Sequence, residues 1–274
     1  MGLFHLQMIN RFSNFLQEIW NKHQLIMVMT KREIKTQYVG SFLSFFWTII
    51  HPIVMITVFW FVFSIGFKSK PLNDVPFVVW LAAGMAPWYC FSDILGGATH
   101  SITSNAHLIK KTLFHAQILP VIRLFSGLVT HAVFLAVLLG LIVLQQLPIL
   151  PTFLQFLYYT FCLCMLVSGL SWIVSALNVF ARDIAQIVGV TLQIGFWATP
   201  IFWDIQIMPQ TVQFWLKLNP MFYIVQGYRE SFINFVPFWQ HPLYTLYFWV
   251  VTVLFCGIGI FVFSRLKPQF ADVL

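Results

Sequence analysis

Apolar and polar positions alternate along this chain in long blocks. Runs of about 20 or more largely apolar residues recur from residue 46 onward, separated by shorter polar connections. A helix needs roughly 20 residues to cross a hydrocarbon core ~30 Å thick. The pattern therefore predicts an all-α integral membrane protein with six spans, whose ends are softened by nearby prolines. The six predicted spans are 46–67, 77–98, 118–144, 153–180, 184–203 and 243–264.

Two further apolar pieces lie between the fifth and sixth predicted spans. Residues 212–218 are too few to cross a bilayer, and residues 221–235 are too polar to do so alone. Both are predicted to be short re-entrant or interfacial helices.

The first residues show a helical period instead of a long apolar run. Apolar side chains recur every three or four positions and polar ones take the opposite face, which is typical of a helix lying in the membrane interface. The chain is therefore divided into a cytoplasmic and interfacial segment, 1–41, and a six-span domain, 42–274. The apolar positions are Phe4, Met8, Phe12, Phe15 and Ile19.

Composition agrees with this division. The chain is 59% hydrophobic and only 8% charged, which leaves too little polar surface for a water-soluble globule. All four cysteines lie in predicted spans, and Cys162 and Cys164 point to different sides of a helix because they are two positions apart. The cysteines are expected to pack as apolar groups, so neither a disulfide framework nor a metal site is predicted.

The distribution of Lys and Arg predicts the orientation. With the N-terminus inside, eleven of the fifteen cations fall on the inner side and four on the outer side. Both termini are therefore expected in the cytoplasm. The net charge of +7 is explained by cations beside anionic lipid headgroups, without nucleic acid.

Several kinds of site are missing from the sequence. No phosphate-binding loop of the form G-x-x-x-x-G-K-[ST] occurs, and neither H-E-x-x-H nor G-x-S-x-G is present. No internal repeat is visible, and the spans contain mainly one charged group, Asp93, where an ion-coupled carrier usually needs several. If the chain transports a substrate uphill, another subunit is expected to supply the energy.

Three local sequences together carry a resemblance to a known family. The first is K-R-E-I-K-T-Q-Y at 31–38, followed by Gly40, Ser41, Trp47 and Pro52. The second is G-M-A-P-W-Y-C-F-S at 84–92 with N-A-H-L-I-K-K at 105–111, followed by Phe114 and by Leu119 and Pro120. The third joins A-R-D-I at 181–184, T-P-I at 199–201 and L-N-P-M at 218–221. In this order the three resemble the type-2 ABC exporter permeases, in the branch that exports O-antigen, capsule and teichoic-acid polymers. Ser44, His115 and Thr199 depart from the pattern of that family.

The resemblance implies a function and partners. Members of this branch form homodimers of six-span subunits, and each subunit binds one copy of a separate cytosolic ABC ATPase. The chain is then the permease that moves a lipid-linked polysaccharide out across a bacterial plasma (inner) membrane. It would be no enzyme by itself and would bind no cofactor or metal, because ATP and Mg are used by the partner subunit.

The resemblance also implies where the ATPase docks. Segment 104–117 matches the coupling helix of the family, whose residues here include Asn105, Lys110, Lys111, Phe114 and His115. The alternative for the two lysines is a lipid anchor. Arg182 and Asp183 are either a second ATPase contact or a salt bridge within the subunit.

Two other groups of residues are candidate substrate contacts. Lys31, Arg32, Lys35 and Tyr38 are assigned to the substrate entrance, where they would touch the ATPase, a diphosphate headgroup or ordinary anionic lipid. Aromatic residues form 18% of the chain, more than a membrane-interface belt requires, and aromatic faces suit weak binding of sugars. The alternative is a lipid-facing role for each ring. The candidate conduit residues are Trp88, Tyr89, Phe91, Asp93, Phe196, Trp197, Phe202, Trp203 and Tyr223.

Asp93 itself has two roles open to it. A single carboxylate within a span must be paired, protonated or hydrated, so Asp93 either faces the conduit or bonds to a neighbouring helix.

Two rival functions remain open. One is a type-2 ABC exporter for a small lipid or drug, which would share the whole architecture. The other is an intramembrane glycosyl- or phosphotransferase, which would need convergent acidic residues in an outer loop. Asp204 and Glu230 are few and far apart in sequence, so the transferase is disfavoured.

Overall fold

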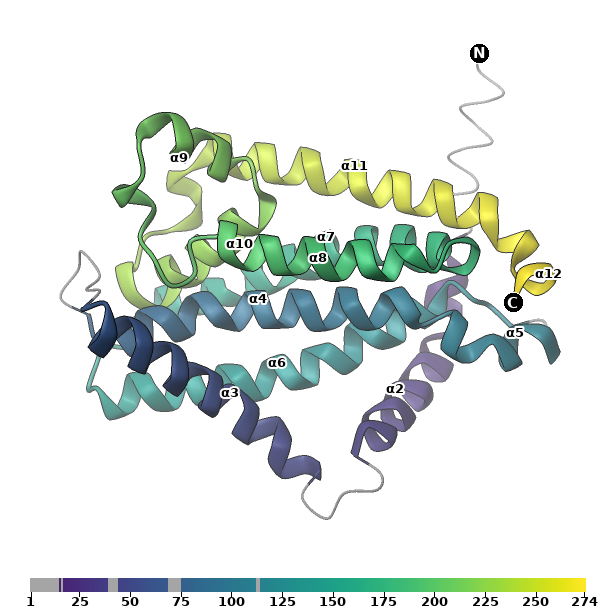
Figure 1. The fold of residues 1–274 in the computed structure, drawn as a ribbon, viewed down its shortest axis with the longest axis horizontal. Helices are drawn as coiled ribbons and strands as arrows, with labels where there is room; N and C mark the ends of the chain where they lie inside the picture. Colours follow the sequence, from purple (N-terminus) through teal and green to yellow (C-terminus); the bar gives the residue numbers. More distant parts are fainter. Residues whose placement is uncertain (1–14, 16, 39–43, 69–74, 112–113) are drawn as a thin grey trace.

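The computed structural model describes residues 15, 17–38, 44–68, 75–111 and 114–274, although the side chains of residues 37, 38, 44, 45 and 111 are not included. This part of the chain is almost entirely helical and contains no strand. The helices form one elongated bundle (Figure 1), with α5, α12 and the C-terminus at one end and α9 at the other.

Five helices of the described chain are long and apolar enough to cross a membrane. They coincide with the first, second, third, fourth and sixth predicted spans. The first comprises α3 (Ser44–Trp60) and the π-helix η1 (Phe61–Gly66), and the fourth comprises η3 (Pro151–Leu154) and α7 (Gln155–Phe180). The others are α4 (Phe77–His100), α6 (Ile118–Leu144) and α11 (Pro242–Leu266), which η7 (Lys267–Gln269) and α12 (Phe270–Val273) extend.

The fifth predicted span is shorter as a helix than expected. Helix α8 (Asp183–Ala198) has 16 residues and therefore rises about 24 Å, less than a typical hydrocarbon core. It ends because Thr199 precedes Pro200, and Thr199 takes an extended conformation with ψ of 133°. Residues 199–203 continue without regular helix.

Helix α4 is the centre of the bundle and packs against α3, α6, α7, α8 and α10. Its small residues allow this, because helices in membranes approach closely where side chains are small. The same principle operates between α7 and α11: a Cβ added at Gly259 would lie 2.4 Å from the carbonyl oxygen of Gly169. A larger residue at either position would push the two helices apart.

The two short apolar pieces between the fifth and sixth predicted spans are helical, as predicted. Helix α9 (Gln210–Lys217) is exposed at the end of the bundle, whereas α10 (Pro220–Arg229) packs against α4 and α7. Helix α10 continues as the π-helix η5 (Glu230–Asn234), which ends where Phe235 adopts a left-handed conformation with φ of 54°. Short 3-10 turns, η4 (Ile205–Ile207) and η6 (Phe238–Gln240), flank this region.

The described N-terminal residues, Phe15 and those of α2 (His23–Tyr38), pack against helices of the bundle away from the α9 end. Residues 1–14 and 16 of the predicted amphipathic helix lie outside the described residues. Phe15 is buried, and its ring packs edge-on against Trp172 and Phe263, so at this position protein and not lipid covers the apolar face. Helix α2 then packs against α6, and η2 (Thr103–Asn105) with α5 (Ala106–Lys111) follows α4.

Candidate functional site

The predicted ATPase-coupling residues gather at one end of the bundle. Helix α5, the turn between α7 and α8, and α12 all lie there (Figure 1). The turn is tied to α4, because Asn178 donates a hydrogen bond to the carbonyl of Thr99 at 3.0 Å. Phe270 of α12 is buried and contacts Phe180 next to the turn. The fold therefore brings the two predicted contact segments to one face.

Individual residues of this face differ in their exposure and in the contacts they make within the subunit. Lys110 is exposed, while the Lys111 side chain lies outside the described part of the chain. Asn105 donates to the carbonyl of Ser101 at 2.9 Å and so braces the turn that leads into α5. Phe114 and His115 are half-buried, and Phe114 packs against the apolar cluster at this end. Their contact with an ATPase stays a prediction.

Arg182 and Asp183 are both exposed at the α7–α8 turn. They form no ion pair with each other or with any other described residue. Asp183 lies in the first turn of α8, where a carboxylate interacts favourably with the positive end of the helix dipole. The geometry leaves their charges available at the surface.

Helix α2 presents two different faces. Ile26 and Thr30 are buried and Glu33 is half-buried, which is the spacing of one helix face turned toward α6. The predicted entrance residues Lys31, Arg32 and Lys35 are exposed on the rest of the helix. Tyr38 ends α2, but its side chain lies outside the described residues.

Asp93 is paired with Arg123, a partner that sequence analysis did not identify. The Arg123 guanidinium lies 2.5 Å from Oδ1 of Asp93 and 3.5 Å from Oε1 of Glu33. The three residues come from α4, α6 and α2, so one cation joins three helices. Gly97 makes room for it, since a Cβ at Gly97 would lie 1.9 Å from the Arg123 side chain.

This cluster also shifts the titration of Glu33. Burial raises the pKa of the Glu33 carboxyl, and the charge of Arg123 opposes that rise. The sequence gives little sign of this pairing. Arg123 lies only five residues after the start of its predicted span, so by position it is one of the inner-side cations.

The structure brings most of the predicted conduit aromatics into one cluster. The Phe196 ring lies 6.2 Å from Trp88 and 5.5 Å from Phe202, and the Phe202 ring lies 4.8 Å from Trp197. Trp88 and Phe202 are each 4% exposed, whereas Trp197 is 53% exposed. Within the single subunit the first two pack in the core, and only Trp197 offers a free face.

The other conduit candidates are distributed around this cluster. Phe91 is buried, Tyr89 and Trp203 are half-buried, and the Trp203 indole donates to the carbonyl of Trp197 at 3.2 Å. Tyr223 belongs to a separate group, because its ring stacks on Phe248 at 4.8 Å. Their contact with substrate stays a prediction.

A cavity of about 260 Å³ lies at the α9 end of the bundle, and sequence analysis identified only Tyr223 of its lining as a candidate substrate contact. Its walls come from α4, α9, α10, η5, α11 and the segment after α8. The fold brings Asp204 and Glu230, which are distant in sequence, to this one space. The remaining charged and aromatic lining residues are Trp80, Lys217, Phe222, Arg229, His241, Tyr244 and Tyr247.

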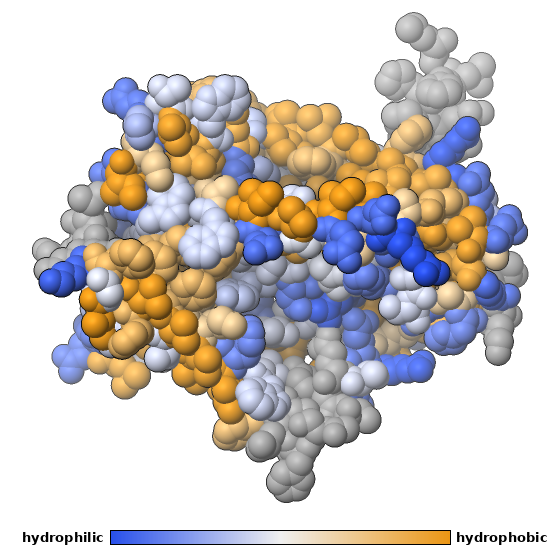
Figure 2. Space-filling model, viewed as in Figure 1, coloured by the Kyte–Doolittle hydropathy of each residue, from blue (hydrophilic) through white to orange (hydrophobic). Residues whose placement is uncertain are grey.

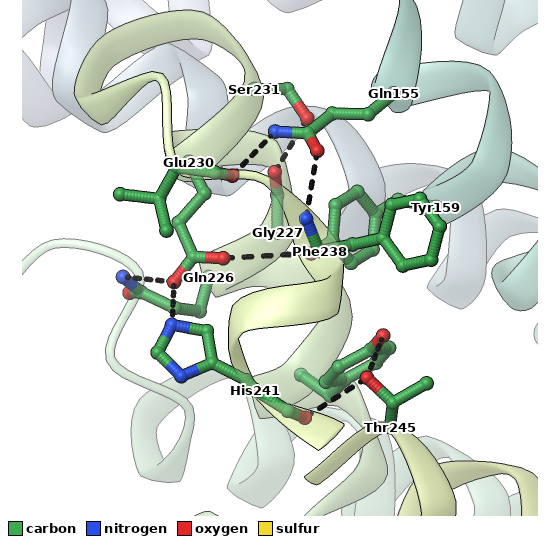
Figure 3. A network of polar contacts seen from close by, with 11 residues as sticks. Gln155, Tyr159, Gln226, Gly227, Glu230, Ser231, Phe238, His241 and Thr245 are labelled. Carbon is green, nitrogen blue, oxygen red and sulfur yellow. Dashed lines mark hydrogen bonds and ion pairs between the residues drawn. The ribbon is translucent and has the colours of Figure 1, made fainter. Parts of the chain in front are cut away.

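Glu230 is the centre of a hydrogen-bond network in the cavity wall (Figure 3). Its carboxylate accepts from Gln226 at 3.3 Å and from Tyr159 at 3.5 Å, and it lies 3.4 Å from Nε2 of His241. Gln155 of α7 connects the loop after η5 to this helix, because its side-chain oxygen accepts a hydrogen bond from the backbone N–H of Phe238 at 3.1 Å. The carboxylate is therefore held in one orientation.

Arg229 is buried beside this network without a carboxylate at ion-pair distance among the described residues. Its guanidinium donates to the carbonyls of Pro200 and Ile201 at 2.7 and 2.6 Å and lies 3.5 Å from the centre of the Trp80 ring. Carbonyl oxygens and an aromatic face together stabilise a desolvated cation. Arg229 thus fixes α10 to α4 and to the segment after α8.

The described residues contain no group of three or more His, Cys, Asp or Glu side chains that could hold a metal.

Comparison with known proteins agrees with the resemblance found in the sequence. Residues 24–233 match the family described as ABC-2 type transporter. The chain is 28% identical over 264 residues to an O-antigen export system permease protein of Myxococcus xanthus, covering 94% of this chain and 98% of the relative. It is 25% identical over 251 residues to an O-antigen export permease of Klebsiella pneumoniae, covering 91% and 95%.

A more distant relative is the polysialic acid transport protein KpsM of Escherichia coli, 21% identical over 205 residues, which cover 73% of this chain and 78% of the relative. The family match covers well over half of the chain and includes α2 through α10. This chain therefore belongs to the ABC-2 type transporter family of membrane proteins.

Proposed function

We propose that this chain is the permease subunit of an ABC exporter that moves a lipid-linked polysaccharide of the O-antigen, capsule or teichoic-acid type from the cytoplasm across the inner membrane. The observation that carries the proposal is the similarity to polysaccharide export and transport proteins over nearly the full length of both chains. The bundle of apolar helices is the architecture that such a subunit requires.

The energy comes from a separate ATPase subunit that binds ATP and Mg. The coupling face is the end of the bundle formed by α5, the α7–α8 turn and α12. The exposed charges of Lys110, Arg182 and Asp183 are available there for a complementary surface. Packing of Phe114 and Asn178 into the subunit supports transmission of a push on α5 to α4 and α7.

Two copies of the chain enclose the conduit. Helix α8 carries an exposed apolar stripe with helical spacing, and α3 carries another. Figure 2 shows apolar surface along both helices with a hydrophilic region between them, which suits a polar path flanked by dimer contacts. The stripe on α8 consists of Ile187, Val190, Ile194 and Trp197.

The membrane arrangement has six spans with both termini inside. Helix α8 and the irregular residues 199–203 form the fifth span together, which compensates for the 16-residue length of the helix. Helices α9 and α10 then lie at the outer surface or re-enter the bilayer. Lys31, Arg32 and Lys35 lie exposed on α2 at the inner surface, where a diphosphate headgroup would arrive.

The test is genetic and biochemical. Deletion of the gene should leave the host with lipid-linked glycan accumulating inside, and the purified chain with its ATPase should hydrolyse ATP faster when that glycan is added. If a drug or a small lipid stimulates hydrolysis and glycans do not, the chain is an exporter of the other class. Normal surface polymer in the deletion strain would refute the proposed function.

A further inference from the structure

The cavity at the α9 end has the size of a small polar ligand. Its volume is about 260 Å³, just below the range of roughly 300–1,000 Å³ that encloses drug-sized molecules. A single sugar unit fits that space, whereas a lipid chain would require a longer and more apolar cavity. Because α9 lies opposite to the coupling face, the cavity is on the side where exported material leaves.

The lining combines aromatic faces with planar hydrogen-bonding groups. Tyr223, Tyr244 and Tyr247 supply aromatic rings to the lining, and Gln226 and Glu230 supply an amide and a carboxylate. Sugars offer apolar C–H faces that pack on aromatic rings and hydroxyls that bond to carboxylates and amides. Both complementary surfaces are present within one cavity.

The charges of the lining favour a neutral ligand. Two backbone carbonyl groups and the Trp80 ring stabilise the Arg229 guanidinium, and because these partners are neutral its positive charge remains part of the lining. Lys217 is the second cation of the lining, and the two carboxylates of Asp204 and Glu230 balance the two cations. A phosphate or a uronate therefore gains no net attraction from the lining, and a neutral sugar is the ligand that the balanced charges suit.

The polar wall is organised before any ligand arrives. Glu230 is oriented by Gln226, Tyr159 and His241 (Figure 3), so little side-chain ordering remains for a ligand to impose. Tyr244 is 42% exposed at the rim, and the Lys217 ammonium lies 5.9 Å from its ring centre. Tyr244 is therefore the ring most accessible to an incoming sugar.

We propose that this cavity is a saccharide subsite on the outer side of the subunit, which binds one neutral sugar unit of the polymer as it leaves the conduit. The inference rests on the proposed function, because the polymer must be a glycan. Binding is weak, with a Kd on the order of 1 mM, since passage requires release at every step.

The experiment measures sugar binding to the purified full chain in lipid nanodiscs. The probes are the methyl glycosides of mannose, galactose and N-acetylglucosamine, followed by saturation-transfer NMR. At least one should receive saturation from the protein. Tyr244→Ala should weaken binding about fivefold, which corresponds to about 1 kcal/mol, whereas Tyr244→Phe should keep most of it.

Matched controls separate the cavity from general effects of aromatic or amide loss. Trp239→Ala removes a ring that is 67% exposed and lies outside the cavity lining, so it should leave binding unchanged. Gln226→Ala should weaken binding and Gln193→Ala should not, because Gln226 lines the cavity whereas Gln193 is exposed on α8 outside the lining.

The outcomes distinguish this inference from the proposed function. No saturation transfer with any probe, or equal binding by Tyr244→Ala and the parent chain, overturns the subsite while polymer export in cells can still depend on the chain. If the deletion strain still exports polymer normally, the proposed function is refuted instead, whatever the NMR result. Binding only by glucuronic acid, added as a fourth probe, overturns the assignment to a neutral sugar.

Discussion

The cluster of Arg123, Asp93 and Glu33 yields a quantitative prediction about stability. Replacing Arg123 by Gln removes the cation that joins α2, α4 and α6 and leaves two carboxylates facing each other. Breaking a fully buried ion pair costs about 3–5 kcal/mol, whereas an exposed pair contributes about 0–1 kcal/mol. The Arg123 side chain is 11% exposed and its partners are 39% and 33% exposed. An intermediate loss of about 2 kcal/mol is therefore expected.

The assay is thermal unfolding of the purified chain in nanodiscs. A loss of about 2 kcal/mol lowers Tm by about 4–8 °C for a chain of this size class. Arg32→Gln is the matched control, because Arg32 is an exposed cation on α2 without an ion pair among the described residues. Its Tm should stay within about 1 °C of the parent value, since exposed surface changes usually cost under about 0.5 kcal/mol.

A double-mutant cycle isolates the pair itself. If Arg123 and Asp93 interact as the structure indicates, Arg123→Gln and Asp93→Asn together should destabilise by clearly less than the sum of the two single losses, with a coupling of at least about 1 kcal/mol. Additivity within about 0.5 kcal/mol, or an Arg123→Gln protein as stable as the Arg32→Gln control, would refute the reasoning.

Three other predictions follow from the arrangement of the bundle. Cysteines introduced at Gln213 and Lys110 should be labelled from outside and from inside respectively, and labelling of position 110 from outside intact cells would contradict the orientation. Charge reversal of Lys110 together with Lys111 should reduce ATPase association measured by co-purification, with normal protein levels in the membrane; undiminished co-purification and export would leave the two lysines as lipid anchors. Trp88→Ala should lower the free energy of unfolding by about 3–5 kcal/mol, because Trp88 is 4% exposed. Trp197→Ala should leave Tm nearly unchanged and lower export modestly, because Trp197 is 53% exposed. If a Trp197→Ala protein of normal abundance exports polymer at the parental rate, Trp197 does not line the conduit.

The sequence alone determined the features that depend on local composition. Five of the six predicted spans are long apolar helices in the structure, because a continuous apolar run of about 20 residues has few stable alternatives in a bilayer. The ordered motifs from residue 31 to residue 221 identified the family, which the match over residues 24–233 confirms. The ranges 212–218 and 221–235 were also correctly predicted as short helices.

Tertiary structure decided which side chain meets which. Lipid and protein interior are almost equally apolar, so hydropathy does not reveal whether a ring such as Trp88 or Trp197 faces a neighbouring helix or the outside. The pairing of Arg123 with Asp93 joins residues 30 positions apart, and no local period records it. The cavity likewise requires α4, α10 and α11 to meet, which brings Trp80, Glu230 and Tyr244 together only after the helices have packed.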